Sequence, residues 1–262
     1  MNNTGPSRTS QVVALTRAAL ERPCSADGDP NAQRALVEGL TFVPPDWLRP
    51  GIEARTRFMD EHVVAAIAGG VRQVVICGAG LDDRALRFRT PGVRFFEIDH
   101  EVTQADKASR LRAMGVDLAG PTLVVCDFQA DSIADALARS GHIAAAPTLY
   151  ICEGLLVYLD QHVCHELLSG IASRAAPGST LAVTLAIHAS DATPAEVVAA
   201  ANARRRTAAA EPWRTILTAD EHLAMLAEAG WAVTAVAESP VASDDVSHAR
   251  RSLLVTASPA AQ

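Results

Sequence analysis

The chain has 262 residues, enough for one large domain or for a domain with a small cap. Hydrophobic residues make up 49% of the chain and aromatic residues only 4%, so we expect a largely aliphatic core. The formal net charge of -7 disfavours binding to nucleic acid or to an anionic membrane, because both ligands are negatively charged. We therefore expect neither nucleic acid nor a membrane among the partners.

The five cysteines form no CxxC pair, and three of them lie inside apolar runs, where cysteine behaves as a small hydrophobic residue. We predict neither a disulfide framework nor a metal site, and we expect a reducing, cytoplasmic location. Residues Met1–Gln11 lack the apolar stretch of a secretory signal. The longest apolar stretch, Ile143–Leu159, contains Pro147 and Glu153, so no membrane span is expected.

The first part of the chain is predicted to be helical. Val12–Val43 forms one or two helices, the proline- and glycine-containing segment Pro44–Gly51 interrupts the chain, and Arg57–Gly69 forms a further helix. We therefore assign residues 1–56 to an N-terminal helical cap segment and residues 57–262 to the main domain.

Five short apolar runs follow, separated by helical stretches. The runs do not alternate between apolar and polar residues, which is typical of strands buried on both faces of a parallel sheet. The runs are Gln73–Cys77, Val93–Ile98, Thr122–Cys126, Thr148–Cys152 and Thr180–Leu185. The helices between them are Glu101–Met114, Ser132–Ser140 and Gln161–Ala175. This order predicts a doubly wound, Rossmann-like α/β sheet.

The regular alternation ends after the fifth run. Residues 189–217 are rich in alanine and long for a connection, so we predict a helical insertion that acts as a lid. A solvated surface helix is the alternative. A helix at Ala219–Ala229 and strands at Ala232–Ala237 and Ser252–Ala257 complete the predicted elements.

A glycine turn and three acidic residues follow consecutive predicted strands. The turn Gly78-Ala79-Gly80 follows the first strand, and Asp99, Asp127 and Glu153 follow the next three. Because ligands bind outside the carboxyl ends of parallel strands, we expect these residues to form one ligand site. A single acid in such a position can instead cap the following helix.

The acidic character of this edge favours a ligand with hydroxyl groups and positive charge. S-adenosyl-L-methionine has ribose hydroxyls, an adenine amine, an α-ammonium group and a sulfonium. Asp99 lies 19 residues after Gly80, a spacing that suits an acid bound to the ribose hydroxyls. Asp127 is expected to bind the adenine amine, with Phe128 beside the ring. Glu153 is expected to face the methionine portion, where positive charge stabilises a buried carboxylate.

A dinucleotide such as NAD or FAD is the rival ligand. Its fingerprint needs the pattern GxGxxG and a helix N-terminus that is free for the pyrophosphate, but Asp83 occupies the third glycine position. Asp82 and Asp83 are also expected to repel a pyrophosphate. The sequence contains no P-loop pattern, GxxxxGKS or GxxxxGKT, which excludes that kind of nucleotide site.

Several segments together resemble the leucine carboxyl methyltransferase family, which includes bacterial methyltransferases of natural-product pathways. They are VVICGAGLDDRALRF (Val74–Phe88), FEID (Phe96–Asp99), CDF (Cys126–Phe128), ICEGLLVYL (Ile151–Leu159) and, upstream, ARTRFMD (Ala54–Asp60), which is similar to the family's arginine motif. The resemblance covers about Arg55 to Leu159. It implies a class I methyltransferase fold, mostly parallel with an antiparallel last strand, and S-adenosyl-L-methionine as the cofactor.

The resemblance also implies that Arg57 pairs with the carboxylate of the cofactor's methionine portion. Arginine suits this role because it binds a carboxylate in a bidentate fork. A surface ion pair of Arg57 with Asp60 or Glu61 is the alternative. The sequence departs from the family pattern at Asp83, where many members have threonine, and at His100, which follows the predicted ribose acid.

Methyl transfer is an in-line displacement, in which an enzyme mainly holds the acceptor and the methyl group in the reacting geometry. A carboxylate acceptor is already ionised near neutral pH, whereas a phenol or alcohol needs a general base such as histidine. His188 is the candidate base, with a cap or loop role as the alternative. Tyr158 is the candidate for lining the acceptor pocket, with a buried structural tyrosine as the alternative.

The sequence therefore predicts an S-adenosyl-L-methionine-dependent O-methyltransferase that methylates a carboxylate of a small-molecule acceptor of natural-product type. Methylation of a phenol or hydroxyl with a histidine base is one alternative. A non-catalytic protein that binds the cofactor is the other.

Overall fold

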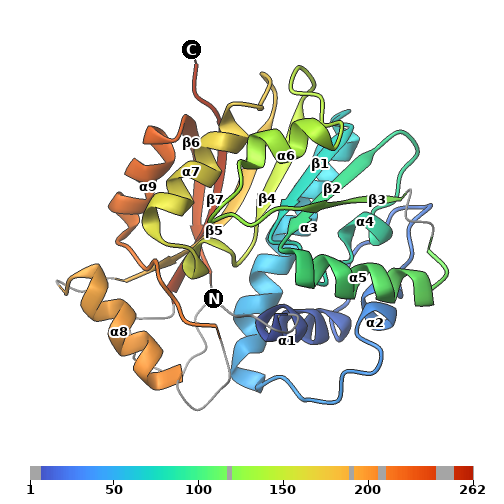
Figure 1. Ribbon diagram of the computed structural model, residues 1–262, viewed down its shortest axis with the longest axis horizontal. Coiled ribbons are helices and arrows are strands. Elements are labelled where there is room, and N and C mark those ends of the chain that lie inside the picture. Colours follow the sequence, from blue (N-terminus) through green and yellow to red (C-terminus); the bar gives the residue numbers. More distant parts are fainter. Residues whose placement is uncertain (1–6, 117–119, 189–191, 206–210, 240–250, 262) are drawn as a thin grey trace.

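The computed structural model describes residues 7–116, 120–188, 192–205, 211–239 and 251–261. In these ranges, a seven-stranded sheet carries helices on both of its faces (Figure 1). The strands are β1 (Gln73–Cys77), β2 (Arg94–Asp99), β3 (Pro121–Val125), β4 (Thr148–Cys152), β5 (Thr180–Ile187), β6 (Trp231–Glu238) and β7 (Arg251–Pro259).

The helices lie between these strands and before the first of them. They are α1 (Arg8–Ala18), α2 (Ala32–Leu36), α3 (Arg49–Ala68), α4 (Arg84–Arg87), α5 (Glu101–Ala113), α6 (Ile133–Arg139), α7 (Gln161–Ala172), α8 (Pro194–Arg205) and α9 (Ala219–Glu228). Two 3-10 turns, η1 (Asp46–Leu48) and η2 (Leu156–Tyr158), complete the described elements.

The strands follow the order β3-β2-β1-β4-β5-β7-β6. Strands β1 to β5 pair in parallel, while β7 runs antiparallel to both β5 and β6. The predicted fold class is therefore confirmed, including the antiparallel last strand. The strand order changes direction between β1 and β4, and in open α/β sheets ligands bind outside the carboxyl ends of the strands at this position.

The central strands β1 and β4 are buried along their whole length, which explains their continuous apolar runs in the sequence. Helices α6, α7 and α9 cover one face, where Leu137, Leu168 and Leu226 pack on the strands. Helices α3 and α4 cover the other face, where Met59 and Phe88 pack on β1, β2 and β4. The central part of the sheet is thus covered on both sides.

The predicted strand bounds agree closely with the observed ones, and those of β1 and β4 coincide with them. The start of α3 was predicted wrongly, because the helix begins at Arg49 instead of Arg57. Pro50 lies in the first turn of α3. A proline is tolerated there, because the backbone N–H groups of the first turn have no partner within the helix. The predicted boundary between residues 56 and 57 therefore falls inside α3.

The predicted insertion at residues 189–217 contains α8, and residues 189–191 and 206–210 of it lie outside the described ranges. Asn202 on α8 exchanges two hydrogen bonds with the backbone of Trp213, at 2.7 and 2.8 Å. Val197 and Ile216 are buried against Val157 of η2. The insertion is therefore packed near the segment that follows β4, and its action as a lid remains a prediction.

All five cysteines are free thiols. No three His, Cys, Asp or Glu side chains of the described residues come together as a metal site would require. The helices seen in these ranges are all too short or too polar to cross a membrane.

Candidate functional site

The carboxyl edge of the sheet brings the predicted positions together. Cys77 at the end of β1 is aligned with Ile98 on β2 and with Cys152 on β4. The residues that follow these three, Gly78, Asp99 and Glu153, therefore lie side by side at one edge. Val125 at the end of β3 is aligned with Asp99, which places Asp127 two residues beyond the same edge.

Asp99 is bound to the glycine turn by its side chain. Its Oδ2 accepts a 2.7 Å hydrogen bond from the backbone N–H of Gly80, and its Oδ1 accepts one of 2.7 Å from that of His100. Burial raises the pKa of Asp99, although both of these hydrogen bonds lower it. Each carboxylate oxygen has a second lone pair, so Asp99 can also accept hydrogen bonds from a ligand.

The glycine turn is enclosed by two other segments. Gly78 and Gly80 have φ angles of +65° and +50°, a region that side-chain-bearing residues rarely adopt. A Cβ atom on Gly78 would lie 2.8 Å from Cδ1 of Leu155, and one on Gly80 would lie 2.6 Å from Cβ of Ser10. Helix α1 is therefore packed directly on the turn, on the same edge of the molecule as the ends of β1 and β2 (Figure 1).

Asp127 and Phe128 lie in the loop after β3. Asp127 is half-buried, and its Oδ1 accepts a 3.0 Å hydrogen bond from the backbone N–H of Gln129. Its own N–H donates to Oδ2 of Asp131 at 2.8 Å. Phe128 is half-buried and packs against the core under α6 and α7. The structure therefore places both residues at the predicted edge, and Asp127 also stabilises its own loop.

Glu153 has arginine neighbours that the sequence did not predict. Its side chain is only 3% exposed and binds three guanidinium groups: Arg17 at 2.6 Å, Arg84 at 2.9 Å and Arg55 at 3.0 Å. Burial alone would raise the pKa of Glu153, but Arg17, Arg84 and Arg55 together lower it to about 2. The positive charge that stabilises Glu153 in the structure therefore comes from arginines, and the expectation that Glu153 faces the methionine portion of the cofactor remains a prediction.

The ion pairs of Glu153 belong to a larger buried network. Its cations are Arg17, Arg22, Arg55, Arg84 and Arg87, and its anions are Asp60, Asp82, Asp83 and Glu153. Five positive and four negative groups leave one positive charge in excess. Arg55 is 24% exposed, whereas the side chains of the other members are at most 6% exposed. Arg55 is therefore the member of the network whose positive charge is accessible to a ligand.

The structure places Arg57 away from this network. Its side chain is 68% exposed and pairs with Glu53 at 3.1 Å, so the prediction that Arg57 belongs to the site is not supported. Two residues along a helix are separated by a rotation of about 200°, so Arg55 and Arg57 point to opposite sides. Arg55 shares the inward face of α3 with Ile52 and Met59, which lie three residues before it and four residues after it. This helical spacing is the sequence pattern that distinguishes the two arginines.

The two aspartates after the glycine turn are neutralised inside the protein. Oδ2 of Asp82 binds Arg17 at 3.0 Å and Arg84 at 2.5 Å. Asp83 is paired with Arg22 at 2.6 Å and with Arg87 at 2.7 Å. The argument that these carboxylates would repel a pyrophosphate is therefore wrong, because their charges are compensated.

The candidate acceptor residues lie beyond the ends of β4 and β5. Tyr158 is the last residue of η2, is half-buried, and is close enough to Arg55 to interact with it electrostatically. His188 follows β5 directly, is 4% exposed, and donates its backbone N–H to Leu217 at 3.1 Å. Both residues are thus at the carboxyl edge, and their roles remain predictions.

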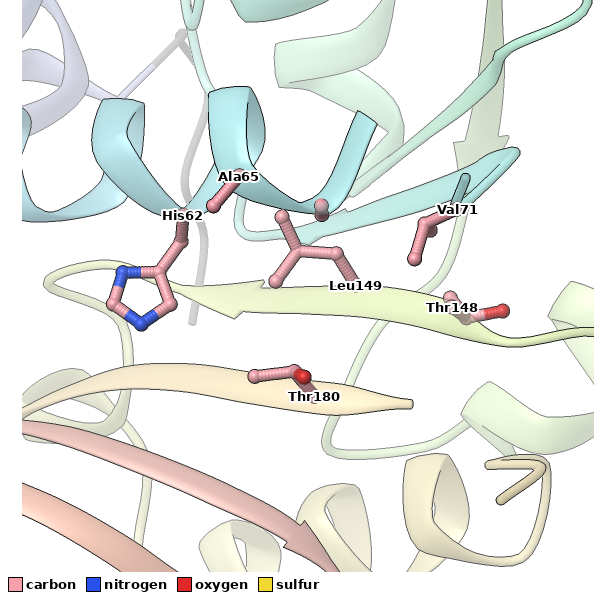
Figure 2. A pocket seen from close by; sticks show the side chains of 7 residues that line it. His62, Ala65, Val71, Thr148, Leu149 and Thr180 are labelled. Carbon is pink, nitrogen blue, oxygen red and sulfur yellow. The ribbon is translucent and has the colours of Figure 1, made fainter. Parts of the chain in front are cut away.

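A hollow of about 230 Å³ lies at the opposite edge of the sheet. Thr148 and Thr180, which begin β4 and β5, line it together with Leu149 and His62 (Figure 2). The His62 ring is held by the Phe58 carbonyl at 2.8 Å and by the Thr256 hydroxyl at 2.9 Å. This hollow is therefore separate from the glycine turn and contains none of the predicted site residues.

Solved structures share this fold over nearly the whole chain. A candidate methyltransferase from Thermobifida fusca YX superposes with a TM-score of 0.62 at 16% identity, covering 99% of this chain and 97% of that one. The magnesium protoporphyrin IX methyltransferase from Synechocystis PCC 6803, solved with bound SAH, gives a TM-score of 0.55 at 14% identity, covering 86% and 90%. At these identities the likeness shows a common fold.

Sequence relatives match over shorter stretches. A candidate S-adenosyl-L-methionine-dependent methyltransferase from Streptomyces avermitilis is 42% identical over 135 residues, which is 51% of this chain and 48% of the relative. One from Parafrankia sp. is 35% identical over 200 residues, covering 68% and 63%. The matched part thus spans about half the length of the Streptomyces relative. The model of the leucine carboxyl methyltransferase family matches residues 13–172, from within α1 to the end of α7. The chain therefore belongs to the leucine carboxyl methyltransferase family.

Proposed function

We propose that this protein is an S-adenosyl-L-methionine-dependent methyltransferase whose cofactor lies across the carboxyl edge, over Gly78-Ala79-Gly80. The observation that carries the proposal is the pair of opposite charges beside this turn. Asp99 presents a carboxylate held by two backbone N–H groups, and Arg55 presents the exposed end of a network with one excess positive charge. The cofactor has matching groups, since hydroxyls lie on its ribose and a carboxylate on its methionine portion.

Arg55 fits the cofactor carboxylate for two reasons. Its Nε atom meets Glu153 at 3.0 Å, which holds the guanidinium group from one side and leaves its exposed end for a second carboxylate. A second carboxylate would also balance the charge of the network, which otherwise has five guanidinium groups for four acids. Burial lowers the pKa of Arg55, so a bound anion would favour its charged form.

The remaining cofactor contacts follow from the strand order. Asp99 on β2 would accept hydrogen bonds from the ribose hydroxyls, and Asp127 after β3 would accept one from the adenine amine, with Phe128 beside the ring. The absence of a Cβ atom at Gly78 and Gly80 makes room for Leu155 and Ser10, which lie beside the proposed cofactor site. The bound cofactor supplies the methyl group on its sulfonium.

We further propose that the methyl acceptor is a carboxylate of a small molecule. The support is membership of a family whose name describes carboxyl methylation. A carboxylate is ionised near neutral pH, so the chain needs only to orient it and to exclude water. The candidate acceptor residue Tyr158 follows the end of β4 in η2, and the predicted lid around α8 packs on the adjoining Val157.

Calorimetric titration with S-adenosyl-L-methionine and with S-adenosylhomocysteine tests the cofactor. We expect saturable binding of both by the full chain, and the absence of binding to folded protein would contradict the proposed function. The acceptor is tested with methyl-labelled cofactor and two panels of small molecules, one of carboxylic acids and one of phenols. A methyl ester releases labelled methanol in mild base, whereas a methyl ether keeps its label, so base-stable product would contradict the carboxylate proposal.

A further inference from the structure

Helix α1 contributes one charged side chain to the carboxyl edge. Arg17, near its end, is 6% exposed and uses its two terminal nitrogens differently: Nη1 binds Asp82 at 3.0 Å, and Nη2 binds Glu153 at 2.6 Å. Its Nε donates to the hydroxyl of Thr56 on α3 at 3.3 Å. Arg17 therefore joins α1 to the loop after β1, to the end of β4 and to α3.

Glu153 connects Arg17 to Arg55. Its Oε2 binds Arg17 and Arg84, while its Oε1 binds Nε of Arg55 at 3.0 Å. The orientation of the carboxylate plane therefore depends on Arg17 on one side and determines where the Arg55 guanidinium group lies on the other. The helix α1 is more than 30 residues away from Arg55 in the sequence, so this coupling exists only in the folded chain.

Arg17 also contributes to the net charge of the network, as each of the other four arginines does. With Arg17 present, five guanidinium groups face four carboxylates, and the excess positive charge reaches the surface at Arg55. Without the charge of Arg17, four cations face four anions. A neutral network would attract a ligand carboxylate much less, because the Coulomb energy of an ion at short range depends on this excess charge.

We propose that Arg17 is a positioning residue for Arg55, acting through Glu153, and that α1 is thereby part of the site for the cofactor's carboxylate. This inference rests on the proposed function, since it concerns the same cofactor. Arg17 need not touch the cofactor: it holds the Glu153 carboxylate, which in turn holds Arg55.

The chain contains a matched control for this proposal. Arg22 lies just after α1, and its side chain is 3% exposed. It forms two sets of ion pairs of similar length, with Asp60 at 2.7 Å and with Asp83 at 2.6 Å, instead of binding Glu153. Arg17→Met and Arg22→Met each remove one buried charge from the N-terminal segment. A general loss of folding would therefore affect both variants, whereas the coupling to Arg55 is lost only in the first.

The test compares two ligands that differ at the group that Arg55 would bind. S-adenosylhomocysteine has the amino-acid carboxylate, and 5'-methylthioadenosine has the same nucleoside without the amino-acid portion. We expect Arg17→Met to weaken binding of S-adenosylhomocysteine about tenfold or more, as the loss of a charged hydrogen bond does, and to leave binding of 5'-methylthioadenosine within about twofold. Arg22→Met removes the same charge from the network but leaves the contacts of Glu153 with Arg17, Arg84 and Arg55, so it should weaken binding of S-adenosylhomocysteine clearly less than Arg17→Met does.

Arg17→Lys keeps the proposal testable if the Met variant does not fold. A lysine preserves the charge but, as a single point donor, cannot bridge Asp82 and Glu153 as the guanidinium fork does. We expect a smaller loss, confined to S-adenosylhomocysteine. Equal losses for both ligands, or losses that Arg22→Met reproduces, would overturn the role of Arg17 and leave the proposed function intact. Failure of the folded wild-type chain to bind S-adenosylhomocysteine would overturn both.

Discussion

Asp99 and Gly80 are joined by a 2.7 Å hydrogen bond from the Gly80 backbone to Oδ2 of Asp99, which fixes the end of β2 to the turn after β1. A second backbone bond from His100 holds the other carboxylate oxygen. The acid is therefore held in one orientation before any ligand arrives. A preorganised acceptor of this kind loses little conformational entropy when it binds hydroxyl groups.

The first prediction concerns replacement of this acid. Asp99→Ala removes the acceptor for two ribose hydroxyls, and hydrogen bonds to a charged group each contribute about 1.5–3 kcal/mol. We expect the affinity for S-adenosyl-L-methionine to fall by at least about 100-fold, measured by calorimetric titration. Asp106→Ala is the control, because Asp106 pairs with Arg110 one turn further along α5 and belongs to none of the contacts at the carboxyl edge. Unchanged affinity in folded Asp99→Ala would remove this residue from the site.

The second prediction compares the two arginines of α3. Arg55→Met should weaken cofactor binding at least tenfold, because it removes the exposed cation of the network and a charge-assisted hydrogen bond. Arg57→Met should change binding by less than about twofold, and stability by about 0.3–0.5 kcal/mol, since an exposed i,i+4 ion pair contributes little. A larger binding effect at Arg57 than at Arg55 would contradict the placement of the carboxylate site.

The strands and their chemistry could be predicted from the sequence because both depend on local patterns. Val74, Val75 and Ile76 form a continuous β-branched run, and a parallel sheet buried on both faces requires such a run. Because these strands are parallel, their carboxyl ends share one edge of the sheet, and the acids that follow them lie at that edge. For this reason the sequence alone predicts that Gly80, Asp99 and Glu153 lie together.

The environment of these acids could not be predicted, because it depends on contacts between distant residues. Arg17 and Asp82 are 65 residues apart, and Arg84 and Glu153 are 69 residues apart. No local pattern indicates such pairs, so the arginines around Glu153 were not predicted and Asp82 was predicted to repel a ligand. The choice between Arg55 and Arg57 could have been made from a local pattern. Because α3 begins at Arg49, the helical spacing places Arg55 on the same buried face as Ile52 and Met59.

The third prediction tests the packing of α1 on the glycine turn. Gly80→Ala introduces a Cβ atom 2.6 Å from Cβ of Ser10 at a residue with a φ of +50°. Gly92→Ala introduces one at a φ of +78° with no other atom within 4 Å, so it shows the backbone strain alone. We expect strain to cost about 1–2 kcal/mol in each variant. Gly80→Ala should lower the free energy of unfolding in urea more than Gly92→Ala does, and it should also weaken cofactor binding. Equal losses of stability in the two variants would contradict the close packing of α1 on the turn.

The fourth prediction concerns the dependence of stability on pH. The arginines around Glu153 lower its pKa from 4.5 to about 2 in the folded protein, although burial alone would raise it. A lowered pKa means that the unfolded chain binds the proton more tightly. The contribution of Glu153 is therefore present above pH 4.5 and is lost as the pH falls towards 2. The shift corresponds to roughly 3 kcal/mol.

Glu153→Gln isolates this contribution, because the variant resembles the protonated acid at every pH. Urea unfolding of both proteins should give a difference in unfolding free energy of roughly 3 kcal/mol at pH 6, since removal of one partner leaves buried arginines uncompensated. The difference should shrink steadily between pH 4.5 and pH 3, because in this range the unfolded wild-type chain takes up a proton at Glu153 while the folded protein keeps the carboxylate ionised. Glu97 does not disturb this comparison, since burial raises its pKa to about 6 in both proteins, despite Lys107 beside it. A difference that stays constant down to pH 3 would mean that Glu153 is not ionised among the arginines, which would contradict the charge balance from which the role of Arg55 is argued.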